Sequence, residues 1–121
     1  MPDSTITYSL AWATKRRKPF LRGEIGARCM RRIHEACTKR GWHIYDLNFK
    51  ENHIYIEVQT PANLSPHKVV AHLKRQTAKG LRKRYAQLRH LPSVWTRQYL
   101  VLPNGYAEHA LLEFLIRQPT V

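Results

Sequence analysis

Carboxylates are scarce in this 121-residue chain, which has 21 Lys and Arg residues against 8 Asp and Glu residues. The resulting formal charge is +13. A folded domain with this excess repels itself unless an anion lies nearby, and the commonest polyanionic partner is nucleic acid, with a membrane surface as the other candidate. The balance of charge therefore favours a nucleic-acid-binding protein.

Long apolar runs are also lacking. No stretch approaches the roughly 18 consecutive apolar residues of a membrane span. The N-terminus does not have the basic segment followed by an apolar one that marks a signal peptide. We therefore expect a cytoplasmic protein without a membrane partner.

Cysteine is limited to Cys29 and Cys37. On the helix predicted there, eight residues correspond to about 12 Å of rise, too far for a disulfide. We interpret both as small buried side chains in a reducing compartment, with a metal site as the alternative. The seven histidines include no HExxH or comparable ligand spacing.

Hydrophobic periodicity predicts seven regular elements. Alternating apolar residues indicate strands at 5–14, 42–49, 52–58 and 94–103, and helical spacing indicates helices at 23–40, 66–84 and 106–118. The order β-α-β-β-α-β is the split βαβ pattern of a ferredoxin-like fold. We therefore predict an α+β fold in one domain spanning 1–121, with an antiparallel sheet, helices on one face and an added C-terminal helix.

Local signals refine these elements. Ser65 followed by Pro66 is typical of a helix N-cap and first helical position, and a break in the alternation near Tyr45 and Asp46 indicates a β-bulge. The strand "NHIYIEV" places three apolar side chains on one face and three polar ones, His53, Tyr55 and Glu57, on the other.

The second long helix is strongly basic. Its sequence "HKVVAHLKRQTAKGLRKR" contains seven Lys and Arg residues and no carboxylate, whereas a solvated face normally mixes signs because like charges four residues apart repel. Phosphate contacts from such a face give affinity without sequence specificity. The predicted nucleic-acid-binding residues are Lys15, Arg16, Arg17, Lys68, Lys74, Arg75, Lys79, Arg82, Lys83 and Arg97. Three aromatic residues, Trp95, Tyr99 and Tyr106, are candidates either for stacking on unpaired bases or for the core.

Four segments occur in the order and at the spacing of a known family: "NHIYIEVQTP", "LSPHKVVAHLKRQTAKGLRK", "VWTRQYLV" and "EFLIRQ". With the N-terminal "YSLAWATKRRKPFLRGEI", nearly the whole chain resembles the small single-tyrosine HUH transposases of insertion sequences, the IS200-like type. The resemblance implies a dimer that recognises DNA hairpins, two metal-ligating histidines two residues apart on a strand, a tyrosine nucleophile on the last helix, and a glutamine one turn later.

This sequence departs from the pattern at the reacting positions. His53 and Gln118 match metal ligands, but Tyr55 occupies the second histidine position and Phe114 occupies the nucleophile position. A phenyl ring has no oxygen with which to attack phosphorus, and a neutral phenol is a poor substitute for imidazole. We therefore expect no cofactor, with Mg²⁺ or Mn²⁺ needed only if the protein is active.

Three hypotheses follow. The first is a transposase-like homodimer that binds hairpin or single-stranded DNA without cutting it. The second is an active transposase in which Tyr55 or Tyr106 is the nucleophile and Glu57 assists the metal. The third is an RNA-binding or scaffolding module, since phosphate is common to DNA and RNA.

Overall fold

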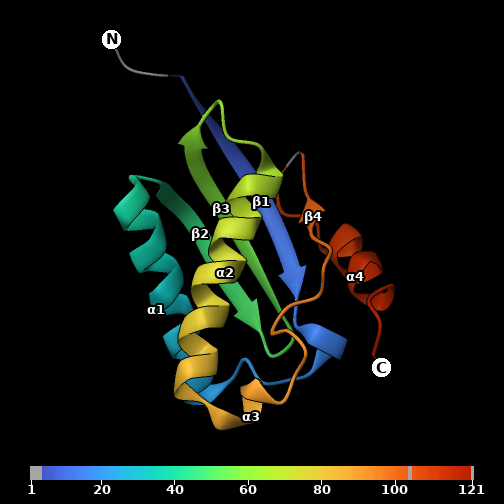
Figure 1. The fold of residues 1–121 in the computed structure, drawn as a ribbon. Helices are drawn as coiled ribbons and strands as arrows, with labels where there is room; N and C mark the ends of the chain where they lie inside the picture. The colour runs from blue at the N-terminus through green and yellow to red at the C-terminus, as the bar shows by residue number, and fades with distance from the viewer. Residues whose placement is uncertain (1–3, 104, 121) are drawn as a thin grey trace.

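One antiparallel sheet organises the chain, with strand order β2-β3-β1-β4 (Figure 1). A computed structural model describes residues 4–103 and 105–120. The principal elements are β1 (Thr5–Ala13), α1 (Gly23–Arg40), β2 (His43–Lys50), β3 (His53–Pro61), α2 (Pro66–Arg84), β4 (Leu100–Val101) and α4 (Glu108–Ile116), with two short helices, η1 (Lys15–Arg17) and α3 (Ala86–Arg89). This arrangement confirms the predicted α+β fold with a split βαβ sheet.

Local sequence signals act where they were expected. The Ser65 side chain accepts a hydrogen bond from the backbone N–H of Lys68 at 3.2 Å and so caps α2. Gly41 ends α1 in the left-handed conformation at φ 71°, which glycine adopts without a Cβ penalty. The register between β2 and β3 shifts between Ile44 and Asp46, which confirms the predicted bulge.

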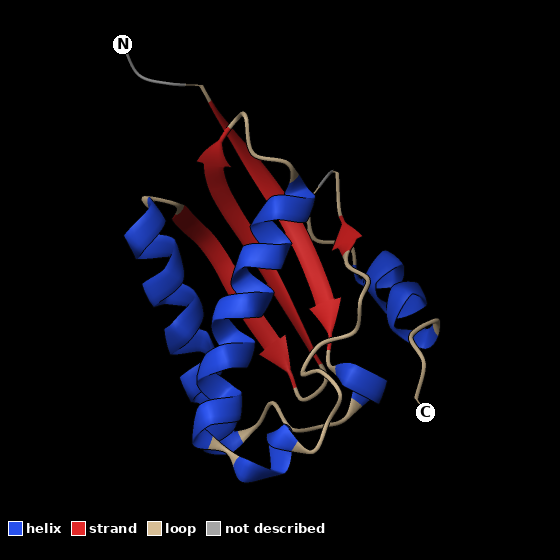
Figure 2. Cartoon of the chain, viewed as in Figure 1, coloured by secondary structure: helices blue, strands red, loops and turns tan. Residues whose placement is uncertain are grey.

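Helices α1 and α2 cover one face of the sheet (Figure 2). The apolar stripe of α2, including Leu73 and Leu81, is buried against strand residues such as Trp12, Ile54 and Ile56. Both cysteines are also buried on the α1 side and form no disulfide. The apolar residues that gave the strand and helix periodicities in the sequence therefore pack together in this core.

Trp95 belongs to this core and does not present a face for stacking. Its ring packs edge-on against Trp12 with centroids 6.1 Å apart, and its Nε1 donates a hydrogen bond of 3.0 Å to Thr77 Oγ1. Tyr99 is half-buried against the same core, and only Tyr106 of the three candidate aromatics is exposed. Of the two roles considered for Trp95, packing is the one that its position supports.

The predicted fourth strand at 94–103 is mostly irregular, which corrects the sequence prediction. Ladder pairing is confined to β4 and to one bridge between Thr14 and Trp95. Between these points the backbone carbonyls of Thr96 and Gln98 accept hydrogen bonds from Lys74 Nζ at 2.7 and 3.0 Å. A side chain of α2 thus takes the place of a neighbouring strand, which periodicity alone could not reveal.

Helix α4 lies on the opposite side of the sheet from α1 and α2, where Leu111 and Leu115 pack on Ala11 and Ala13 of β1. It is shorter than the predicted 106–118, because Tyr106 precedes it and Gln118 follows its last turn. None of the helices within the described residues combines the length and apolar character needed to cross a membrane.

Candidate functional site

The face of the sheet that points away from α1 and α2 carries polar side chains in regular cross-strand register. His53, Tyr55 and Glu57 occupy its centre on β3, and strand register places one neighbour from each flanking strand beside each of them. From β2 these neighbours are Lys50, Asn48 and Asp46, and from β1 they are Ala13, Ala11 and Ser9. The small alanines leave the room that α4 occupies.

A pocket of about 380 Å³ opens over part of this polar face. Its lining residues are Asp46, Asn48, Phe49, Lys50, His53, Tyr55, Tyr106 and Leu111. Three of these residues, His53, Tyr55 and Tyr106, are candidates that the sequence predicts. Asp46, Asn48 and Lys50 were missed, although the predicted hairpin register was a signal that could have placed them beside β3.

His53 is held as a neutral imidazole. Its Nδ1 lies 2.8 Å from the amide oxygen of Asn52, an acceptor that places the ring proton on Nδ1 and leaves a lone pair on Nε2. Burial lowers the pKa of His53, and repulsion by the Lys50 charge lowers it further. The ring is therefore suited to accept a hydrogen bond or to bind an electrophile.

Tyr55 is held as a neutral phenol. Burial raises its pKa; the neighbouring Ser9 hydroxyl opposes this, and the nearby Glu57 and Asp46 add to it. Its ring meets that of Tyr106 almost perpendicularly, with centroids 5.1 Å apart. The phenolate that would ligate a metal or attack phosphorus is thus disfavoured at neutral pH.

Gln118 and Phe114 do not join this pocket. Gln118 is 3% exposed, and its Nε2 donates to Gln98 Oε1 at 3.3 Å and to the Phe114 carbonyl at 3.1 Å. The Phe114 ring packs with Leu111 and Leu115 on β1. Neither residue lines the pocket that contains His53.

The donor set near His53 does not fit a divalent metal. Within the described part of the chain, no three His, Cys, Asp or Glu side chains gather closely enough to hold one. Glu57 is half-buried, accepts a hydrogen bond of 3.4 Å from Ser9 Oγ and does not line the pocket. One imidazole beside a phenol is a thin set for Mg²⁺ or Mn²⁺, which favour oxygen-rich octahedral sites.

Tyr106 lies closer to this pocket than the sequence suggested. A continuous helix over 106–118 would have carried it about 12 Å along the axis from Phe114. Because α4 begins only at Glu108, Tyr106 instead sits before the helix, 56% exposed and against Tyr55. Tyr106 and His53 therefore share one pocket.

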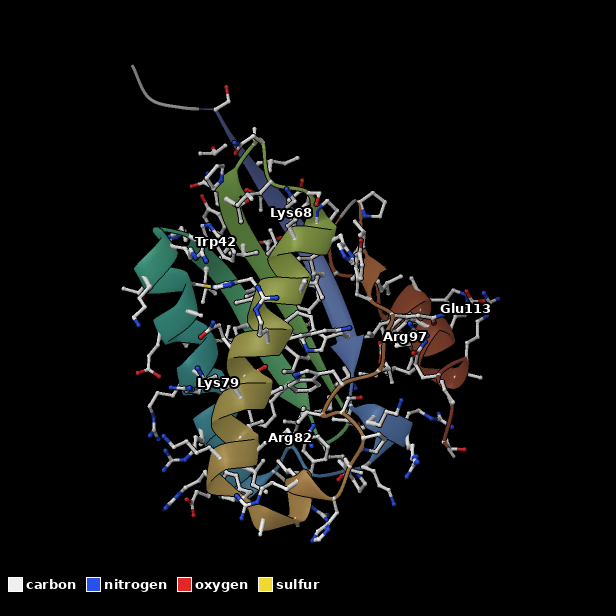
Figure 3. All side chains as sticks on the ribbon, viewed as in Figure 1. Trp42, Lys68, Lys79, Arg82, Arg97 and Glu113 are labelled. Carbon is white, nitrogen blue, oxygen red and sulfur yellow. The ribbon has the colours of Figure 1, made fainter. Side chains whose placement is uncertain are left out.

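The cations of α2 lie on the other side of the sheet, on the outer surface of the helix layer. Figure 3 shows Lys68, Lys79 and Arg82 along α2 and Arg97 on the neighbouring segment. A groove of about 430 Å³ follows this boundary and is lined by Lys74, Arg75, Arg82 and Arg97 together with Ala71, Ala78 and residues 93–96. Lys68, Arg75, Lys79 and Lys83 are exposed.

Lys74 is the exception among these cations. Two of its N–H groups are engaged by the carbonyls of Thr96 and Gln98, and burial lowers its pKa to about 8. Its main role in the structure is to hold the 96–98 segment against α2. Of the predicted nucleic-acid-binding residues, it is therefore the one least available to a phosphate.

Three further predicted cations form η1, at the end of β1. Arg16 and Arg17 have positive φ values of 57° and 54°, and Arg16 is exposed. The backbone N–H of Thr14 donates to the carbonyl of Asn52 at 3.0 Å, and that of Lys15 donates to Val94 at 2.9 Å. Element η1 therefore connects the edge of the groove to the strand end that carries His53.

Comparison with known proteins agrees with this architecture. The chain matches the sequence model of a family described as "Transposase IS200 like" over residues 3–118. No curated protein matches it significantly. A crystal structure of a candidate transposase from Deinococcus radiodurans R1 is similar with a TM-score of 0.85 and 20% identity, covering 99% of this chain and 95% of the other. A REP-associated tyrosine transposase bound to a REP hairpin has a TM-score of 0.58 and 13% identity, covering 93% and 66%.

Proposed function

Since the chain belongs to the IS200-like transposase family, we propose that it binds hairpin or single-stranded DNA and does not cut it. One observation carries the proposal. The side chain at the nucleophile position is the oxygen-free ring of Phe114, packed against β1, while cations remain exposed along α2. Binding and cutting depend on different atoms, and Phe114 supplies no oxygen for cutting.

The arrangement of positive charge supports a nucleic acid as the ligand. Arg75, Arg82 and Arg97 line one continuous groove, and η1 adds three more cations between that groove and the His53 end of β3. A flexible phosphate backbone follows such a path by simple charge attraction. The structural relative that is bound to a REP hairpin supports a hairpin as the form of DNA.

A covalent-adduct assay separates binding from cutting. The protein is incubated with a labelled hairpin carrying a single-stranded extension, with and without Mn²⁺, and the products are run on a denaturing gel while anisotropy measures binding. We expect salt-sensitive binding, with about 10³–10⁵-fold lost between 50 and 200 mM salt if roughly 6–10 phosphates are contacted. We expect no covalent band.

Strand cleavage through Tyr106 is the competing function, because that tyrosine is exposed and shares a pocket with His53. Its oxygen would form a bond to phosphorus as a DNA strand oxygen leaves with the proton. A covalent band that disappears in Tyr106→Phe would establish this function, whereas a band lost in Tyr55→Phe would identify the other tyrosine. Either result would overturn the proposal that the protein does not cut.

Two finer parts of the proposal concern partners. A homodimer is supported by Leu112 and Ile116, one turn apart on α4, which are 50% and 73% exposed while Leu111 and Leu115 are buried. RNA or a scaffolding role remains the alternative to DNA, because phosphate contacts do not distinguish the two nucleic acids. Competition between matched DNA and RNA hairpins tests the preference. A cytoplasmic location stays a prediction.

A further inference from the structure

A second cationic cleft lies between α1 and α2, separate from both the groove and the His53 pocket. It has a volume of about 430 Å³. Its lining residues are Arg28, Arg32, Gly80, Lys83 and Arg84. Only Lys83 of these was predicted to contact nucleic acid, since α1 showed no comparable run of uninterrupted positive charge.

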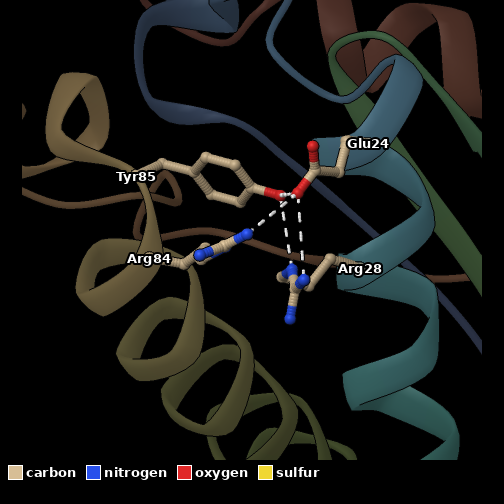
Figure 4. A network of polar contacts seen from close by, with 4 residues as sticks. All are labelled: Glu24, Arg28, Arg84 and Tyr85. Atoms are coloured by element: carbon tan, nitrogen blue, oxygen red, sulfur yellow. Dashed lines mark hydrogen bonds and ion pairs between the residues drawn. The ribbon is translucent and has the colours of Figure 1, made fainter.

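The positive charge of the cleft is only partly neutralised. Figure 4 shows Glu24 together with two of the lining cations: Arg28 and Arg84 lie 3.8 and 3.7 Å from Glu24 Oε1, and the Tyr85 hydroxyl donates to the same oxygen at 3.0 Å. Within the described residues, neither Arg32 nor Lys83 has an ion-pair partner. Four cations thus face one carboxylate, which leaves the cleft complementary to an anion.

Gly80 makes the geometry of the cleft possible. A Cβ at this position would lie 2.4 Å from Nε of Arg32, so the guanidinium rests directly on the backbone of α2. Glycine in the middle of a helix lowers helix stability relative to alanine, and Arg28 with Arg32 places like charges four residues apart. The mid-helix glycine and the repulsion between Arg28 and Arg32 are both locally unfavourable. A bound anion would offset the repulsion between the two arginines.

The chemistry of the lining identifies the kind of anion. Apart from glycine, every lining side chain is a guanidinium or ammonium, and none offers an aromatic face or a neutral polar edge to a base. Such a site takes backbone phosphates whose bases are turned away, as in a paired stem. The cleft and the groove are lined by different faces of α2, since their residues on that helix are 80, 83 and 84 in one and 71, 74, 75, 78 and 82 in the other.

We propose that the α1–α2 cleft binds the backbone phosphates of a double-stranded stem, while the groove on the other flank of α2 takes the single strand. This inference rests on the proposed DNA-binding function and assigns the two parts of a hairpin ligand to two surfaces. Arg32 and Lys83 make the principal contacts, and Glu24 with Tyr85 positions Arg28 and Arg84.

The experiment compares three variants on two ligands, a blunt DNA hairpin and an unstructured oligothymidine with the same number of phosphates. Arg32→Gln removes one cleft charge, and Arg31→Gln removes an exposed charge from the next position of α1 as the matched control. Gly80→Ala keeps every charge but displaces the Arg32 side chain, while alanine favours the helix. Thermal melting is recorded for each.

We expect Arg32→Gln and Gly80→Ala to weaken hairpin binding roughly tenfold at about 0.1 M salt, with Arg32→Gln reducing the salt slope by about one. Oligothymidine affinity and Arg31→Gln should change by less than about twofold, and Gly80→Ala should melt no lower than the wild type. Weakened binding in a variant with raised or unchanged melting temperature cannot come from misfolding.

Equal hairpin affinity in Arg32→Gln, Gly80→Ala and the wild type would overturn the cleft assignment while leaving the proposed function intact. Equal losses on both ligands would overturn the assignment to a paired stem. Failure of the wild type to bind either ligand would instead refute the proposed function itself.

Discussion

The two faces of the sheet differ in what they require of individual residues. On the helix side, a large core that includes Trp12 and Trp95 supports an outer layer rich in Lys and Arg. On the opposite side, α4 rests on a small cluster around Ala11 and Ala13. Next to this cluster is a polar pocket whose lining residues include His53 and no second histidine. The helix side therefore provides stability and positive charge, whereas the pocket side depends on the identity of a few side chains.

This difference bears on the proposal that the protein binds DNA without cutting it. Phosphate contacts contribute separately, so that losing one cation removes only one increment of affinity. Catalytic groups act as a unit, and removing the nucleophile costs nearly as much as removing the whole constellation. The proposed absence of cutting rests on Tyr55 and Phe114, both on the pocket face, and involves none of the cations of the helix layer.

The largest expected effect tests the core under the helix layer. Trp95→Ala should lower the free energy of unfolding by about 3–5 kcal/mol, because it empties a buried site and removes the hydrogen bond to Thr77. Urea denaturation measures the change. Tyr106→Ala, an exposed aromatic on the pocket face, should stay within about 0.5 kcal/mol. Similar losses in both variants would remove the distinction between the faces.

The next effect tests the outer charge of α2. Arg75→Glu combined with Lys79→Glu should weaken DNA binding roughly 100-fold near 0.1 M salt, about tenfold for each phosphate contact removed. Anisotropy titrations at several salt concentrations give both affinity and slope. Lys39→Glu with Arg40→Glu changes the net charge equally at the far end of α1 and should cost much less. Equal losses would mean that overall charge, and no particular surface, governs binding.

A smaller effect separates the structural cation from the binding ones. Burial lowers the pKa of Lys74 to about 8, against 10.5 for an ordinary lysine. Between these values the unfolded chain binds more protons at this residue than the folded one, so its contribution makes stability rise with pH. Melting temperatures from pH 8 to 10 should rise less steeply in Lys74→Met than in Lys79→Met. Parallel pH profiles would show that Lys74 titrates like a surface lysine.

The smallest effect on folding concerns the exposed side of α4. Leu112→Ser with Ile116→Ser should change the free energy of unfolding by no more than about 0.5 kcal/mol per site, since both side chains are exposed in the monomer. The same change should convert a dimer to a monomer in light-scattering measurements. A wild-type protein that is already monomeric at high concentration would contradict the proposed dimer.

Sequence reasoning succeeded where neighbouring residues decide the structure. Short-range sequence patterns predict the cap at Ser65, the bulge at Asp46 and the buried stripe of α2. It failed at 94–103, where the strand periodicity is genuine but Lys74, more than twenty residues earlier in the chain, binds the carbonyls. The position of Tyr106 was also missed, because a helix boundary displaced by two residues carries it to the pocket.

The amino-acid sequence by itself determined the excess of positive charge, the alternation that builds the sheet and the absence of an attacking oxygen at Phe114. These are properties of residue type and local spacing, and packing cannot alter them. Tertiary structure alone decided that Lys74 turns inward, that Gln118 bonds Gln98 and leaves the His53 pocket, and that Arg32 rests on Gly80. Each depends on how segments distant in the chain approach one another, and that approach is set by the packed core as a whole.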